Sequence, residues 1–170
     1  MKLLQITLFT VFLFIVSCKM ASRELANYYN NTAEMHQQIA IDLMGLSKKY
    51  GVETRVRKGV DGGIFLSFYY ANNPEPKTIL YDSLLNRDNS YTEGASKFIV
   101  SVGLIKTINK IRYRTIGADS NHTFFGDVYR AKDVYDGILI IDKRQSIDSV
   151  TKLPYKEIAP FTFVSQEALH

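Results

Sequence analysis

The sequence predicts an α+β fold: a largely antiparallel sheet built from two helix–hairpin units, with two helices packed on one face. Three observations support this prediction. Residues 23–50 have the apolar period of a helix, two short turn signals are each flanked by strand-like runs, and residues 137–141 form an apolar run with the length of a buried strand. The length favours a single domain over residues 23–170.

A long amphipathic helix is predicted over residues 23–50. Its apolar residues recur at intervals of three, four or seven, which keeps them on one side of a helix. They are Leu25, Tyr28, Met35, Ile39, Leu43, Leu46 and Tyr50. Ser22 is suited to cap the start of this helix, and Gly51 is suited to end it.

A first hairpin is predicted around Asp61-Gly62-Gly63, with strands at 52–60 and 64–70. A two-residue loop would place Arg55 and Arg57 on the same face as Ile64. A three-residue loop instead unites the apolar positions of both strands, and burial favours that register. We therefore expect a three-residue loop with a left-handed glycine, and an outer face that carries Arg55, Arg57, Phe65, Ser67 and Tyr69.

The chain between the two hairpins gives weaker signals. Pro74 and Pro76 indicate a loop over residues 71–77, and residues 78–90 fit either a short strand or a helical turn. A second helix is predicted over residues 92–110, although its β-branched residues are not strong helix formers. Its expected buried side consists of Phe98, Ile99, Val102, Ile105 and Ile108.

A second hairpin is predicted around Asp119-Ser120-Asn121, with strands at 111–118 and 122–130. An even-length loop would bury Ile111, Tyr113, Thr115, Phe124 and Val128. It would turn outward Arg112, Arg114, Phe125, Asp127 and Tyr129. Residues 137–141 follow as a buried strand, and residues 161–164 as a further short strand. The rest of 146–170 has no clear period.

The first eighteen residues have the pattern of an export signal. Lys2 precedes an apolar run over residues 3–16, whose 14 residues suit a secretory signal of about 7–15 residues better than a membrane span of about 20. Ile15-Val16-Ser17-Cys18 then resembles the lipobox of bacterial lipoproteins, although Ile15 stands where Leu is usual. The resemblance implies a signal peptide at 1–17, lipidation of Cys18 such as diacylglycerol and palmitate, and a short tether at 18–22.

Location follows from the same resemblance. Lys19 after the cysteine, in place of the Asp that retains lipoproteins in the inner membrane, favours an outer membrane if the cell has two membranes. Two alternatives stay open: an uncleaved signal anchor, and an ordinary secretory signal of a eukaryotic secreted protein. The second gains from two triplets that fit N-glycosylation, Asn30-Asn31-Thr32 and Asn121-His122-Thr123.

Composition excludes several classes of protein. Cys18 is the only cysteine, which excludes an intrachain disulfide, a cysteine-ligated zinc site and a cysteine nucleophile within the domain. Removal of Lys2 with the leader would lower the net charge from +4 to +3. This charge fits an anionic membrane surface or glycan and is too small to indicate nucleic acid.

One candidate ligand-binding surface emerges, on the outer face of the sheet. Arg55 would lie opposite Tyr69, Arg112 opposite Tyr129, and Arg114 opposite Asp127. Guanidinium groups among aromatic rings suit phosphate or carboxylate groups, with sugars stacking on the rings. The plain alternative is a solvated sheet face with ordinary cross-strand pairs.

The histidines give no metal signal. His36, His122 and His170 have no ligand spacing, so we expect no metal or other cofactor. Asp119, His122 and Asp127 suggest an acid–base group, but turn chemistry explains Asp119 more simply.

We therefore expect a membrane-anchored envelope lipoprotein without enzymatic activity. It would bind a protein partner or an anionic envelope polymer. The alternative from another class is an envelope or secreted hydrolase whose catalytic residues the sequence does not reveal.

Overall fold

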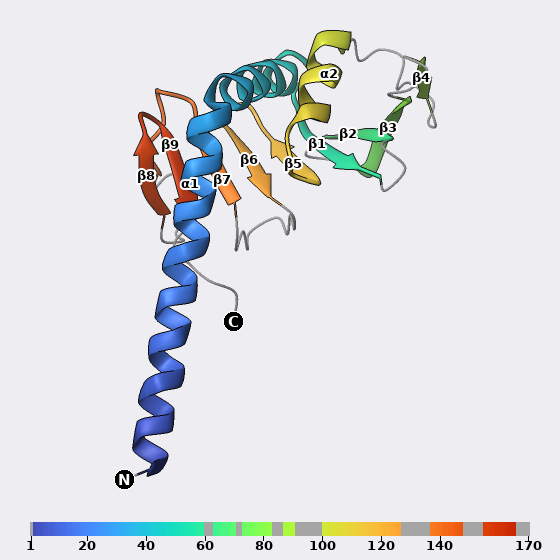
Figure 1. Ribbon diagram of the computed structural model, residues 1–170. Coiled ribbons are helices and arrows are strands. Elements are labelled where there is room, and N and C mark those ends of the chain that lie inside the picture. The colour runs from blue at the N-terminus through green and yellow to red at the C-terminus, as the bar shows by residue number, and fades with distance from the viewer. Residues whose placement is uncertain are drawn as a thin grey trace.

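A computed structural model describes residues 2–59, 63–70, 73–82, 87–90, 100–126, 137–147 and 155–165, with side chains from residue 23 onward except in residues 73–82 and 87–90. These residues form one antiparallel sheet and two helices, which confirms the α+β class (Figure 1). The helices are α1 (Lys2–Tyr50) and α2 (Val102–Lys110). The strands are β1 (Val52–Lys58), β2 (Ile64–Tyr70), β3 (Asn73–Asp82), β4 (Arg87–Ser90), β5 (Thr115–Ala118), β6 (His122–Gly126), β7 (Gly137–Ile141), β8 (Tyr155–Ala159) and β9 (Thr162–Ser165).

The described strands form a single sheet in the order β4-β3-β2-β1-β5-β6-β7-β9-β8, and every neighbouring pair is antiparallel. Strands next to each other in sequence are mostly neighbours in the sheet. The exception at its centre is β1, which pairs with β2 on one side and β5 on the other.

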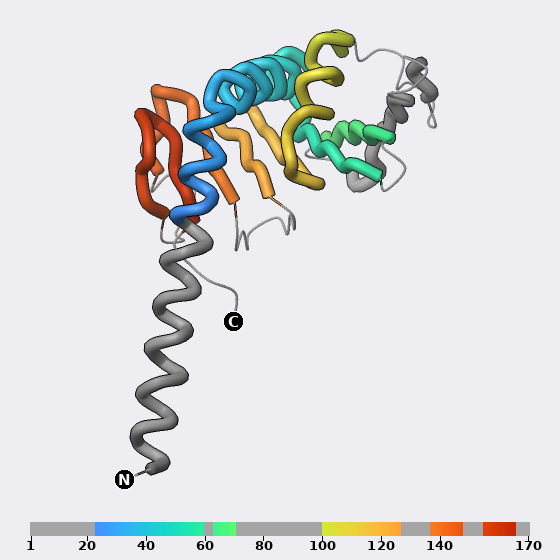
Figure 2. Tube along the Cα trace, viewed as in Figure 1, coloured from blue at the N-terminus to red at the C-terminus, as the bar shows by residue number. Residues whose placement is uncertain are grey.

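Helix α1 is longer than expected. It begins at Lys2, so Ser22 lies inside the helix and the prediction that it caps the start is wrong. Thr32 has non-helical angles, φ −134° and ψ 18°, and the helix changes direction there (Figure 2). The predicted end is confirmed, because Gly51 follows Tyr50 with φ +64°, a left-handed conformation that glycine adopts without steric cost.

The faces predicted for β1 and β2 are confirmed. Val52, Thr54 and Val56 are buried on one face with Ile64, Leu66 and Phe68. The pairing differs by two residues from the expected one, since Arg55 lies opposite Ser67 and not opposite Tyr69. A shift of two residues leaves every side chain on its face. The loop at 60–62 lies outside the described residues.

The predicted loop at 71–77 is wrong from Asn73 onward, because β3 begins there and pairs with β2. Its prolines occupy an irregular part of the ladder, between the pairs Phe68–Lys77 and Tyr70–Asn73. β4 pairs only with Ile79–Asp82. The prolines are therefore placed where no regular ladder needs their missing N–H groups.

Helix α2 covers only the end of the predicted 92–110 segment, and residues 92–99 lie outside the described residues. Ser101 caps the helix, and its side chain accepts a hydrogen bond from Leu104 N at 3.1 Å. Ile105 and Ile108 are buried as expected, whereas Val102 is 47% exposed. The buried side of α2 therefore begins at Leu104.

The second hairpin has the expected even-length loop, closed by a hydrogen bond from Asp119 N to His122 O at 3.0 Å. The predicted faces are wrong for β6, because Phe125 is fully buried in the main core. The chain bends at 111–114, so Ile111 and Tyr113 are buried ahead of β5 while Thr115 is only half-buried. Residues 127–130 lie outside the described residues.

The described core has two parts. The main cluster lies between the helices and the sheet, and a second cluster lies on the other face, formed by Phe124, Leu139, Ile141 and Phe163. β7 lies between the two clusters, which explains why all five of its residues are buried. The predicted buried strand at 137–141 is confirmed.

Candidate functional site

The face of β1 and β2 that points away from the main core is the candidate binding surface, called here the β1–β2 outer face. It carries three cross-strand pairs, Glu53–Tyr69, Arg55–Ser67 and Arg57–Phe65. All six side chains are half-buried or exposed, in alternation with the buried residues of the same strands. The two strands therefore present one polar and aromatic face opposite their buried one.

Arg55 is the most constrained residue of this face. Its guanidinium carbon lies 4.5 Å from the centre of the Tyr69 ring, and its Nε donates to Glu53 Oε1 at 3.2 Å. The residues opposite it are small, Ser67 on β2 and Gly117 on β5, so the side chain extends diagonally to Tyr69. The Arg55 side chain is 27% exposed, so an anion can reach it from solvent.

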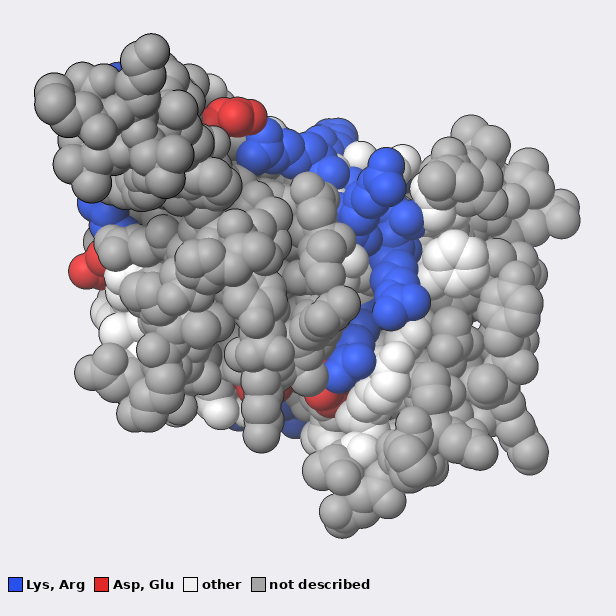
Figure 3. All heavy atoms as spheres, turned by 90° about the horizontal axis from the view of Figure 1, so that it is seen from below, with Lys and Arg blue, Asp and Glu red and all other residues white. Residues whose placement is uncertain are grey.

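The β1–β2 outer face carries two arginines on one strand. Arg57 is exposed beside Arg55 on the same strand face. Figure 3, which views the molecule from below, shows a stripe of Lys and Arg side chains that borders uncharged side chains. The arrangement can bind phosphate or carboxylate groups with the arginines and a planar or apolar group with the rings.

The structure does not bring all four predicted arginines together. Arg112 contacts α1 and not the outer face: its guanidinium lies 4.5 Å from the centre of the Tyr28 ring and donates to Glu24 Oε1 at 3.2 Å. Its backbone N–H also donates to Tyr28 Oη at 2.8 Å. The prediction that Arg112 shares a face with Arg55 is therefore wrong, because the bend at 111–114 interrupts strand alternation.

The other two predicted site residues are placed only in part. Arg114 is exposed, and its carbonyl oxygen accepts a hydrogen bond from Lys58 N at 2.9 Å. Tyr129 lies outside the described residues, as does Asp127. Cys18 belongs to the helical segment α1. Of the predicted site residues, the structure places Arg55, Arg57 and Tyr69 together on the β1–β2 outer face.

His36 is a fully buried histidine of α1 that is absent from the apolar residues predicted for this helix. It lies among aromatic rings from three parts of the chain, with ring centroids 4.9 to 5.7 Å away: Tyr28, Tyr29, Tyr113 and Phe125. A spacing of seven residues, Tyr29 to His36 to Leu43, is the sequence signal that places it on the buried side of α1.

The hydrogen bonds of His36 define its protonation. Nδ1 lies 2.9 Å from the carbonyl oxygen of Thr32, which can only accept, so Nδ1 carries the proton of the neutral ring. Nε2 has no hydrogen-bond partner among the described residues. Burial lowers the pKa of His36, the hydrogen bond to Thr32 opposes this, and the charge of Arg112 lowers the pKa further. The buried ring is therefore held in its neutral form.

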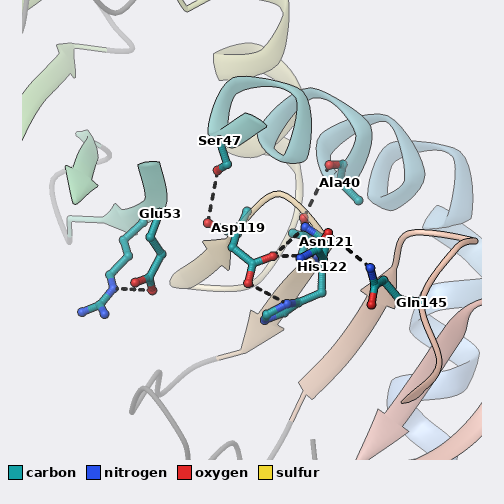
Figure 4. Close-up of polar contacts among 10 residues, drawn as sticks. Ala40, Ser47, Glu53, Asp119, Asn121, His122 and Gln145 are labelled. Atoms are coloured by element: carbon teal, nitrogen blue, oxygen red, sulfur yellow. Dashed lines mark hydrogen bonds and ion pairs between the residues drawn. The ribbon is translucent and has the colours of Figure 1, made fainter. Parts of the chain in front are cut away.

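Asp119 and His122 form the pair that could suggest acid–base chemistry (Figure 4). Asp119 Oδ2 lies 3.0 Å from His122 Nδ1, while Oδ1 accepts the backbone N–H groups of Asn121 and His122 at 2.7 and 2.9 Å. Burial raises the pKa of Asp119, but the bonds and charge of His122 and the backbone donors outweigh it, so the pKa is lowered. All these contacts lie within one turn.

The same turn is fastened to the segment after β7. Asn121 O accepts from Asp142 N at 2.6 Å, and Gln145 Nε2 donates to Asn121 Oδ1 at 3.5 Å (Figure 4). Asn121 therefore joins the two loops, while Asp119 and His122 bond within their own turn. No group of three or more His, Cys, Asp or Glu residues within the described parts of the chain is arranged to hold a metal ion.

Comparison of the chain with protein-family models, with curated proteins and with solved structures found no match. Among the described residues, no helix combines the length and apolarity needed to cross a membrane.

Proposed function

We propose that this chain is a lipid-anchored protein of a bacterial cell envelope that acts as a binding or assembly module and not as an enzyme. Cys18 carries the anchor, on the resemblance of residues 15–18 to a lipobox. The domain at 23–170 faces the periplasm or the cell surface, with an outer membrane favoured if the cell has two membranes. A secreted protein is the alternative location.

The binding surface in this proposal is the β1–β2 outer face, and its ligand is an anionic envelope polymer or an acidic protein partner. The observation that carries the proposal is the Arg55 guanidinium 4.5 Å above the Tyr69 ring. The Arg55 side chain stays 27% exposed, and Arg57 adds an exposed cation on the same face. Exposed charges contribute little to stability, so these arginines can be replaced to test binding with little effect on folding.

The anchor is tested by the intact mass of the full-length protein extracted from membranes. We expect a chain that begins at Cys18 and carries diacylglycerol and acyl groups. Cys18→Ala should accumulate as an uncleaved precursor or at another location. A Cys18→Ala variant that is processed and enters detergent like the wild type would contradict the lipoprotein proposal.

The binding face is tested with a soluble polyanion, heparin, across a range of salt concentrations. Arg55→Gln combined with Arg57→Gln should weaken binding and flatten its salt dependence. Lys48→Gln combined with Lys49→Gln removes the same charge from the exposed end of α1 and is the matched control. If both double variants weaken binding equally, the effect reflects net charge and the outer face has no special role.

An envelope hydrolase is the second candidate, and the contact between His122 Nδ1 and Asp119 is the observation that favours it. A hydrolase of this kind would lose its activity in His122→Gln. The full-length protein can be screened against ester and glycoside substrates. Turnover that disappears in this variant would replace the binding proposal with an enzymatic one.

We also propose that the fold comprises two related helix–hairpin units. The supporting observation is that α1 precedes the antiparallel pair β1–β2 and α2 precedes the antiparallel pair β5–β6. The two units would meet where β1 pairs with β5.

A further inference from the structure

We propose that the β1–β2 outer face rests on the anionic lipid headgroups of the same membrane that holds Cys18. This inference rests on the proposed lipid anchor and names the anionic surface that the outer face meets. Three features of the described chain support it: a short helical connection to the anchor, the side of the domain on which that connection leaves, and the chemistry of the face.

The connection between Cys18 and the domain is short and regular. The backbone of α1 is helical from Lys2, and its one non-helical residue is Thr32, so residues 18–23 follow the helix. Five residues of α-helix rise about 7.5 Å. Residue 23, where the domain begins, therefore lies within about one Debye length of the acylated residue at physiological salt. A flexible linker would remove this constraint, because its ends can take many separations.

The direction of this connection is tied to the sheet. Leu25 and Tyr29 are buried, and Tyr29 Oη lies within hydrogen-bond distance of Thr162 Oγ1 on β9, at 3.3 Å. Gln37 Nε2 donates to Tyr29 Oη at 2.8 Å and to Thr162 Oγ1 at 3.1 Å. These contacts hold the turns of α1 at Leu25 and Tyr29 against β9, so the helix approaches the domain from a defined side.

That side is also the side toward which the β1–β2 outer face points. Figure 1 shows that α1 enters the domain from below, beside β8 and β9. Figure 3 views the molecule from below and displays the stripe of Lys and Arg side chains. Because α2 and the later part of α1 lie over the other face of the sheet, the β1–β2 outer face points to the side from which α1 enters, and a bilayer that accepts the acyl chains faces it.

The chemistry of the face suits lipid headgroups. Arg55 and Arg57 supply two guanidinium groups for phosphates, and Tyr69 and Phe65 supply rings of the kind that settle at the boundary between headgroups and acyl chains. Glu53 offsets part of the charge of Arg55, with which it pairs at 3.2 Å. On an anionic bilayer, two basic residues near the surface shift the contact equilibrium by about 30-fold.

The chain contains no tryptophan, so one introduced tryptophan reports its own site without background. Tyr69→Trp keeps a ring under Arg55, and Phe65→Trp is a second reporter on the same face. Ile41→Trp is the control, because Ile41 is 60% exposed on α1, which packs on the opposite face of the sheet. Each full-length lipidated variant is reconstituted into vesicles that contain phosphatidylcholine brominated near the headgroup, with or without an equal part of phosphatidylglycerol.

We expect strong quenching of the Tyr69→Trp and Phe65→Trp variants, greater with phosphatidylglycerol, and little quenching of Ile41→Trp. Adding Arg55→Gln and Arg57→Gln should shift the contact equilibrium by about 30-fold and remove most of the quenching. Adding Lys48→Gln and Lys49→Gln instead should leave it unchanged. Equal quenching of all three reporter variants would overturn the proposal.

Two measurements on the same samples separate this proposal from the proposed function. An intact mass without lipid on Cys18 would refute the anchor itself. A lipidated Tyr69→Trp variant whose fluorescence is not quenched by vesicles, yet responds to soluble heparin, would keep the proposed binding function and refute the membrane as its ligand.

Discussion

His36 Nδ1 lies 2.9 Å from the carbonyl oxygen of Thr32, the residue at which α1 departs from helical geometry. The Thr32 hydroxyl donates to Tyr28 O at 2.6 Å, so the side chains of Thr32 and His36 both bond to backbone carbonyls at the kink. The ring of His36 is buried against β6 through Phe125 and against the segment before β5 through Tyr113. The kink in α1 is therefore joined to the sheet by a neutral imidazole.

Acidification should destabilise the fold through His36. Its pKa is lowered in the folded protein by burial, so the unfolded chain binds the proton more readily. The contribution of His36 to the free energy of unfolding is fully present above the ordinary histidine pKa of 6.5. It falls as the pH drops toward the pKa in the folded protein, by up to about 1.4 kcal/mol per pH unit. Urea unfolding between neutral and mildly acidic pH measures this slope.

His36→Gln should flatten that slope, because an amide can still donate to Thr32 O but does not titrate. His122→Gln is the control, since it removes a half-buried histidine and leaves the His36 titration in place. The groups that surround His36 are the rings of Tyr28, Tyr29 and Tyr113, with Arg112 as the nearby charge. An unchanged slope in His36→Gln would show that other groups govern the acid response.

Ser47 and Thr54 should be energetically coupled. Both are buried, and Ser47 Oγ donates to Ala118 O at 3.2 Å, which leaves the Thr54 hydroxyl to donate to Ser47 Oγ at 2.9 Å. Ser47→Ala or Thr54→Val alone should lower the free energy of unfolding by about 1–3 kcal/mol, because each leaves a buried polar group without its hydrogen-bond partner. The double variant should cost less than the two together, by about 1 kcal/mol. Strict additivity would mean that the two hydroxyls do not interact.

Gly137→Ala should be strongly destabilising. A Cβ atom at this position would lie 2.2 Å from Phe125 O and 2.4 Å from Phe124 Cζ, and the first of these is backbone. We expect a loss of about 1–3 kcal/mol or more from overpacking. Gly45→Ala is the matched control, because nothing lies within 4 Å of its Cβ position on α1, and it should gain about 1 kcal/mol from helix propensity. Thermal unfolding of both variants gives the comparison.

Lys58 should stabilise the end of α2. Its Nζ donates to the carbonyl oxygens of Asn109 and Ile111, where α2 ends and its dipole is negative. Burial lowers the pKa of Lys58. Lys58→Met keeps the apolar stem and removes the donor, so it should cost about 0.5–1.5 kcal/mol in urea unfolding. Lys156→Met on β8, where the side chain is exposed, should change stability by less than about 0.5 kcal/mol.

Periodicity predicted the parts of the fold that have one polar face. β1 and β2 alternate between buried and exposed residues, so even a shifted register kept Arg55 and Arg57 on the outer face. The second hairpin lacks this contrast, because Phe124 and Phe125 are buried in different clusters on opposite faces of β6. A strand that is buried on both sides carries no alternation from which its orientation can be predicted.

The candidate site was predicted only in part for the same kind of reason. The alternating pattern from Ile111 to Thr115 is typical of a strand, yet the chain bends there and Arg112 stacks on Tyr28 of α1. Likewise, local propensity did not indicate the enclosure of His36, because its ring neighbours include Tyr113 and Phe125 from far along the chain. Both features depend on tertiary contacts.

Strand β1 joins two parts of the sheet that are synthesised far apart. β1 to β4 form successive antiparallel pairs, whereas Thr54 of β1 pairs with Ala118 of β5, 64 positions later. Pairs at long sequence separation form late because loop closure is slow. During synthesis the edge of β1 that pairs with β5 therefore stays unpaired until β5 has been synthesised. Arg55 and Arg57 place charge on that edge, and charge discourages an open strand from pairing with another chain.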